Sequence, residues 1–115
     1  MSVRAADVKL SPEAAAVLDA LQASAEPGAR SILRRIRVLR EILLANCLHG
    51  EVVKKGRIPH RLLSEYGARN LYVENLPSFW RLLYTVAKEE RDRYVIILAI
   101  VDHRTYEDRL GVRRR

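Results

Sequence analysis

The chain has 115 residues, of which 49% are hydrophobic, and this size predicts a single domain over residues 1–115 rather than two separate cores. The 21 lysines and arginines outnumber the 14 acidic residues, and a net charge of +7 favours a polyanionic partner, either nucleic acid or an acidic protein segment. A single cysteine, Cys47, excludes an internal disulfide framework and a multi-cysteine zinc site, and no stretch is apolar enough to span a membrane. We therefore expect a soluble cytoplasmic protein with no membrane partner, in which Cys47 is a small core residue.

The N-terminal segment predicts a short strand and a helix. Residues 3–10 alternate loosely between apolar and polar, as in a weak strand. The Ser-Pro-Glu sequence at residues 11–13 favours a helix start, because serine caps the backbone, proline fits the first turn and glutamate suits the helix dipole. This helix is expected to run to about Ala25.

A second helix is predicted from about Ala29 to Leu48. Gly50 is expected to close it in the left-handed conformation that glycine adopts easily. One side of this helix carries an apolar stripe that needs a sheet to cover it, so the two helices are expected to form a hairpin packed on a sheet. The stripe consists of Ile32, Ile36, Leu39 and Leu43.

Basic residues gather in three places. Five arginines lie within residues 30–40 before any acid, and a solvated cationic face explains them more simply than a phosphate-binding stripe. Residues 59–66 predict a short helix capped by Gly67, next to the densest basic segment before the C-terminus. The chain ends in a basic tail, residues 112–115. The basic segment contains Lys54, Lys55, Arg57, His60 and Arg61.

Residues 70–106 predict three strands joined by tight connections, since β-branched and aromatic residues dominate there. Within residues 78–86, alternate positions form an apolar core face, which leaves Arg81 on the opposite face toward solvent or a groove. Residues 94–101 are apolar on both faces, which indicates a central strand that delivers His103 at its exit. The predicted fold class is α+β, an N-terminal helical hairpin on a small, mainly antiparallel sheet of three to four strands. The core face consists of Trp80, Leu82, Tyr84 and Val86.

The polar residues of this sheet suit cleavage of an RNA phosphodiester by its own 2′-hydroxyl. The sequence has no phosphate-binding glycine loop, nucleophile elbow or paired-histidine metal motif, so we expect neither cofactor nor metal. A guanidinium matches two phosphate oxygens, and an imidazole can take or give a proton near neutral pH. Arg81 and His103 supply these groups, and Tyr106 adds a phenol. A surface ion pair for Arg81, a strand-end hydrogen bond for His103 and half-buried packing for Tyr106 are the simpler explanations.

Two segments, LPSFWRLLYTV and ILAIVDHRTYEDRLG, resemble the third and last strands of the RelE/ParE superfamily of toxins from type II toxin-antitoxin systems. The segment GEVVKKGRIPHRLLSEYGARNLYVENLP is similar to archaeal members, and the likeness covers residues 3–111. In its RelE/YoeB-like branch, the resemblance implies a ribosome-dependent endoribonuclease that cuts messenger RNA. It also implies an acidic antitoxin as partner, in a hetero-oligomer with the toxin.

The resemblance assigns expected roles to single residues. Arg81 matches the strand arginine that stabilises the phosphoryl transition state, and His103 and Tyr106 match the terminal acid/base and the orienting or stacking position. Glu74 stands, with Tyr72, where some members carry lysines, and is either a general base or a surface strand residue. Four basic residues are expected to hold RNA phosphates, namely Lys54, Lys55, Arg57 and Arg61.

Two other functions remain open. A ParE-like inhibitor of DNA gyrase shares the fold without RNA chemistry. A non-enzymatic nucleic-acid-binding module, such as an inactivated toxin, would use the basic residues alone. The presence of His103 and Tyr106 favours the ribonuclease.

Overall fold

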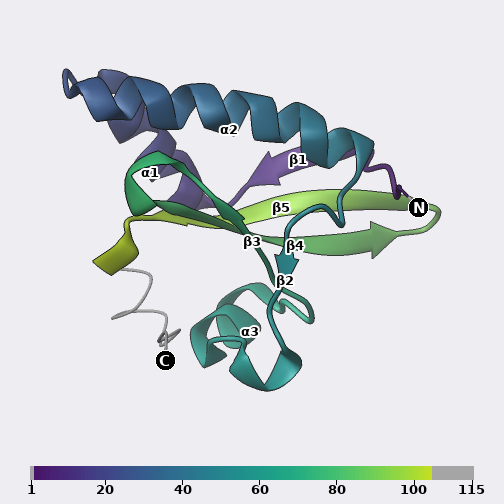
Figure 1. Cartoon of the computed structure of the whole chain (residues 1–115). Coiled ribbons are helices and arrows are strands. Elements are labelled where there is room, and N and C mark those ends of the chain that lie inside the picture. Colours follow the sequence, from purple (N-terminus) through teal and green to yellow (C-terminus); the bar gives the residue numbers. More distant parts are fainter. Residues whose placement is uncertain (1, 105–115) are drawn as a thin grey trace.

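A computed structural model describes residues 2–104 (Figure 1). It is an α+β structure in which three α-helices accompany a five-stranded mixed sheet over the described residues. The elements in chain order are β1 (Asp7–Leu10), α1 (Pro12–Ala23), α2 (Pro27–Ala45), β2 (Glu51–Val52), the 3₁₀ turn η1 (Lys55–Arg57), α3 (His60–Tyr66), β3 (Tyr72–Asn75), the 3₁₀ turn η2 (Pro77–Phe79), β4 (Arg81–Glu89) and β5 (Asp92–Val101).

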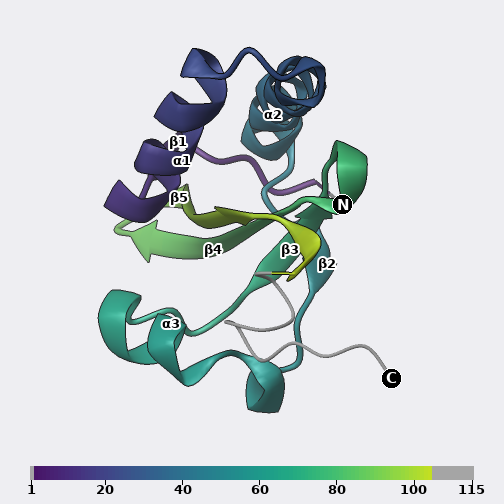
Figure 2. The same cartoon turned by 90° about the vertical axis from the view of Figure 1, so that its left-hand side faces the viewer.

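The strands follow the order β1-β5-β4-β3-β2, with β1 parallel to β5 and every other neighbouring pair antiparallel. Figures 1 and 2 show α1 and α2 on one face of the sheet, which we call the hairpin face, and α3 on the other, which we call the α3 face. The expected number of three to four strands was wrong. The strand missed is β2, because its two exposed residues are too short to show any alternation and are recognised only by their pairing with Val73 and Tyr72.

The helix start at Ser11 is confirmed. Its Oγ accepts a hydrogen bond from the Ala14 amide at 3.0 Å and donates one to the Leu98 carbonyl at 2.7 Å, so the cap also fastens α1 to β5. Helix α1 ends at Ala23, and α2 ends at Ala45, three residues before the expected end. Because Asn46 is extended there, it interrupts the helix earlier than its apolar pattern indicated.

The expectation for Gly50 was wrong, since its backbone is not left-handed. A Cβ atom at this position would lie 2.9 Å from Tyr84 Oη and 3.1 Å from the Val73 carbonyl oxygen. Glycine is therefore needed here for a close approach of the chain to the sheet. The predicted cap at Gly67 is confirmed, because its φ is +63° at the end of α3.

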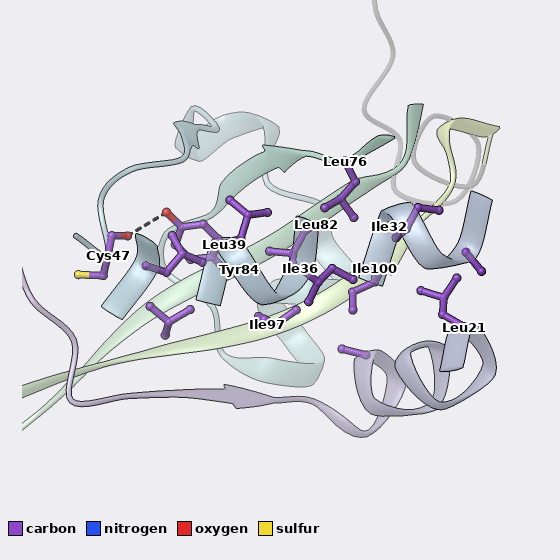
Figure 3. Close-up of a cluster of buried hydrophobic side chains, with 14 residues drawn as sticks. Leu21, Ile32, Ile36, Leu39, Cys47, Leu76, Leu82, Tyr84, Ile97 and Ile100 are labelled. Atoms are coloured by element: carbon purple, nitrogen blue, oxygen red, sulfur yellow. Dashed lines mark hydrogen bonds between the residues drawn. The ribbon is translucent and has the colours of Figure 1, made fainter. Parts of the chain in front are cut away.

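Two hydrophobic cores lie on opposite faces of the sheet. The larger one, beneath α1 and α2, contains the predicted stripe of α2, which is buried throughout (Figure 3). The smaller one, between α3 and the sheet, contains Leu62, Leu71, Leu83, Leu98 and Ala99. Strand β5 contributes to both, as expected for a central strand whose two faces are covered.

A β-bulge shifts the register inside β5. Leu83 lies opposite Ala99 but Tyr84 lies opposite Ile97, so Leu98 is an extra residue. Leu98 and Ala99 consequently both contribute to the core of the α3 face. None of the described helices is long and apolar enough to cross a membrane.

Candidate functional site

Arg81 is the first residue of β4, rather than a mid-strand residue as the sequence suggested. It pairs with Asn75 of β3 and with Val101 of β5, whose side chain packs against the core of the α3 face. Residues directly opposite each other in a sheet share a face, so Arg81 also belongs to the α3 face. Its side chain is partly buried, and Nη1 donates a hydrogen bond to the Trp80 carbonyl at 3.0 Å.

His103 follows β5 by two residues. Since Val101 is the partner of Arg81, the histidine lies just beyond the same end of these two strands, where β5 ends in yellow in Figure 1. Its ring centroid is 6.1 Å from that of Phe79, with the planes 57° apart, and its Nδ1 is shielded from solvent. The structure therefore brings the arginine and the histidine to one end of neighbouring strands.

Phe79 is a feature of this site that the sequence analysis missed. It was placed within an extended strand, but Ser78 and Phe79 both have left-handed backbones, with φ of +61° and +63°. Strand β4 starts only after this turn, which is closed by a hydrogen bond from the Leu76 amide to the Trp80 carbonyl at 2.9 Å. Phe79 is 70% exposed. Proline and serine at positions 77 and 78 signal a turn, but nothing in the sequence shows that the bulky Phe79 completes it.

Glu74 lies away from these residues. It is opposite Leu82, whose side chain is in the core of the hairpin face, so Glu74 also points to that face and away from Arg81. Glu74 is 6% exposed, and its carboxylate accepts a hydrogen bond from His49 Nδ1 at 2.7 Å. Glu74 thus neither shares a face with the arginine nor is a surface strand residue. The sequence missed His49 as its partner because 25 residues separate the two.

A stacked tyrosine pair lies on the same face as this carboxylate. Tyr72 and Tyr84 stack with centroids 5.1 Å apart. Tyr84 Oη accepts a hydrogen bond from the Gly50 amide and donates one to the Cys47 carbonyl, both at 2.9 Å, and Figure 3 shows the bond to Cys47. Burial raises the pKa of the Tyr84 phenol well above its ordinary value. Cys47 is fully buried, and burial raises the pKa of its thiol as well. The Tyr84 hydroxyl therefore links β4 to the segment after α2 within the protein.

The basic residues between β2 and α3 fall into two kinds. Lys54, Lys55 and Arg57 are exposed in the connection that leads to α3. Arg61 instead forms ion pairs with Glu13 and Glu65, both at 3.2 Å, and fastens α3 to the start of α1. The first three residues can face a polyanion, whereas the Arg61 guanidinium is engaged by carboxylates of the protein.

A groove of about 420 Å³ lies between α1, α2 and the η2 turn. Its walls are mostly apolar and include Leu21, Ile32 and Trp80. A neighbouring hollow of about 630 Å³ shares Leu21, Ser24 and Glu26 with it and is bordered by three arginines of α2. These are Arg30, Arg34 and Arg37.

Tyr106 and the tail at residues 112–115 lie outside the described residues. Within residues 2–104, no group of three or more histidine, cysteine or acidic side chains is arranged to hold a metal ion. No protein-family model matches the chain, and comparisons with curated proteins and with solved structures find no match.

Proposed function

We propose that this protein is the toxin of a type II toxin-antitoxin system, of the RelE/ParE superfamily, and that it cuts messenger RNA on the ribosome without a metal. The observation that carries the proposal is that Arg81 and His103 lie at the same end of neighbouring strands, where His103 is beside the exposed Phe79. A rigid sheet holds these groups, as a site for a phosphodiester requires.

In the proposed reaction, the 2′-hydroxyl of the RNA attacks the adjacent phosphorus and the bond to the 5′ oxygen breaks. The products are a 2′,3′-cyclic phosphate and a 5′-hydroxyl. Arg81 stabilises the charge that grows on the phosphoryl oxygens. His103 transfers a proton at the attacking or the departing oxygen. Glu74 is not the base of this reaction, because it lies on the hairpin face.

The exposed residues Lys54, Lys55 and Arg57 would hold phosphates of messenger or ribosomal RNA at the α3 face. The net charge of +7 supports a polyanionic target of this kind. Arg61 is left out of this proposed contact because its carboxylate partners already occupy it.

The proposed partner is an acidic antitoxin that forms a hetero-oligomer with the toxin in the cytoplasm. Support comes from the apolar groove beside η2 and from the arginines of α2 that border the neighbouring hollow. An amphipathic acidic segment would place apolar side chains in the groove and carboxylates near these arginines.

Programmed ribosomes and a defined messenger RNA provide the test. We expect cuts within the messenger that disappear in Arg81→Ala and His103→Ala. Arg91→Ala in the β4–β5 turn and His60→Ala at the start of α3 are matched controls, since both residues are exposed and lie in other elements. These controls should cut like the unchanged protein. Undiminished cutting in both site variants would refute the proposed site.

Expression in cells separates the other two functions. Arrested translation with cleaved messenger supports the ribonuclease. DNA damage signalling with intact messenger would overturn it in favour of a gyrase inhibitor. Salt-sensitive binding of nucleic acid without growth arrest would overturn it in favour of a binding module.

A further inference from the structure

The turn that precedes β4 displays the only phenylalanine of the chain. Its neighbours Leu76 and Trp80 pack against the core of the hairpin face, whereas Phe79 itself is 70% exposed, the highest value among the exposed large hydrophobic residues of the described chain. The turn therefore directs its two ends inward and the phenyl ring outward.

The backbone conformation of this turn is unusual for an exposed phenylalanine. Ser78 and Phe79 are two consecutive residues that are not glycine, yet both have φ above +60°. A bulky side chain at positive φ is strained, and glycine or asparagine would adopt the same turn with less strain. Such strain persists where the surrounding structure fixes it, and it gathers at ligand-binding sites. Because Phe79 is 70% exposed, most of its surface is left for contacts outside the core.

The side chains next to Phe79 suggest the chemical class of a ligand for its phenyl ring. The imidazole of His103 is tilted by 57° and lies 6.1 Å away, so it does not stack flat against the phenyl ring. Arg81 begins β4 two residues later, on the face that carries a basic connection. Aromatic rings beside cationic groups are the usual support for unpaired bases of single-stranded nucleic acid, because every base has a face that can stack.

We infer that Phe79 stacks on an unpaired RNA base next to the phosphate that Arg81 and His103 contact. This inference rests on the proposed function, since it takes RNA as the ligand. The ring would hold one nucleotide out of its neighbours' stack and so fix the position of the phosphate relative to the histidine. Stacking tolerates every base and is stronger for the larger purines, so Phe79 selects an unpaired strand rather than one sequence.

A messenger RNA with 2-aminopurine in the ribosomal A-site codon tests this inference. A 2′-O-methyl group on each nucleotide of the codon blocks the attacking hydroxyl, so binding is measured without cleavage. We expect the protein to change the 2-aminopurine fluorescence on binding, both on the ribosome and with a free single strand at higher concentration. Phe79→Leu should lose this change and bind about tenfold more weakly. Phe79→Tyr, which keeps the ring, should behave like the unchanged protein.

Val52→Ala is the matched control, because Val52 is 65% exposed on β2 and its loss removes apolar surface elsewhere. Circular dichroism verifies that each variant is folded. Unchanged fluorescence and affinity in Phe79→Leu would overturn the inference, and so would the absence of a fluorescence change with the unchanged protein on both substrates.

The inference and the proposed function fail in different ways. If Arg81→Ala and His103→Ala still cut the unblocked messenger, the catalytic proposal is wrong, whereas dependence of the fluorescence change on Phe79 still supports the stacking role. If those two variants are inactive and Phe79→Leu binds normally, the ribonuclease stands and the stacking role is wrong.

Discussion

The two faces of the sheet use their polar residues in opposite ways. On the hairpin face, the Glu74 carboxylate and the Tyr84 hydroxyl are buried, and partners within the protein satisfy both. On the α3 face, the cover is a helix of seven residues, and Arg81 lies on this face with part of its surface exposed. His103 and Phe79 lie at the same end of the sheet and are also partly exposed. A titratable residue in a strand is thus structural or available to a ligand according to what covers its face, and residue type alone does not distinguish the two.

The largest expected effect compares Arg81 with Glu74. Arg81→Ala should lower the rate of messenger cleavage about 100- to 1,000-fold, the usual loss when one group that stabilises transition-state charge is removed. Glu74→Gln should leave the rate per folded molecule unchanged, because the glutamine still accepts a hydrogen bond from His49 on the far face. Single-turnover cleavage on programmed ribosomes measures both. A loss of rate in Glu74→Gln equal to that in Arg81→Ala would break the distinction between the faces.

The next effect concerns stability on the hairpin face. Tyr84→Phe removes both hydrogen bonds of the hydroxyl and leaves the buried Cys47 carbonyl without that donor, which should lower the free energy of unfolding by about 1–3 kcal/mol. Urea denaturation followed by circular dichroism gives this value. The cleavage rate of the folded variant should not change, and a change would place Tyr84 in the site.

The pH dependence of stability gives a second test of the structural role of Tyr84 on the hairpin face. Burial raises the pKa of Tyr84 in the folded state above its ordinary 10.0, so above that pH the unfolded chain loses a proton that the folded chain retains. Stability from this residue is full below pH 10 and declines as the pH rises further, by at most about 1.4 kcal/mol per pH unit. Urea midpoints between pH 8 and 11 should therefore fall less steeply in Tyr84→Phe. Parallel curves would show that the phenol ionises alike in both states.

The smallest effects distinguish the two kinds of basic residue. Replacing Lys54, Lys55 and Arg57 by glutamine should reduce the salt dependence of RNA binding by about one unit of logarithmic slope for each phosphate that the protein no longer neutralises. Arg61→Gln should leave that slope unchanged and cost at most about 1 kcal/mol of stability, as expected for partly exposed ion pairs. A lower slope in Arg61→Gln would show that RNA displaces its carboxylate partners.

The elements that the sequence predicted well depend on local patterns. The Ser11 cap, the buried stripe of α2 and the two-sided apolar run of β5 each need only residues within a few positions of one another. The α+β class follows from these elements.

The elements that it missed depend on distant contacts. Strand β2 and the requirement for Gly50 arise from pairing and packing against β3 and β4. The face of Glu74 depends on strand register, in which one residue of difference moves a side chain to the other face. The left-handed Phe79 has no local signal, since its neighbours predict only that a turn exists.

The bulge at Leu98 determines the side on which the last residues of the sheet emerge. Before it, Val95 and Ile97 contribute to the core of the hairpin face, and strict alternation of the same sequence would place Val101 on that face as well. Because Leu98 is left without a partner, Ile100 takes the hairpin face instead and Val101 lies opposite Arg81. A chain without Leu98 would keep these pairs in a regular ladder, so the bulge adds Leu98 to the core of the α3 face while Val101 stays beside Arg81.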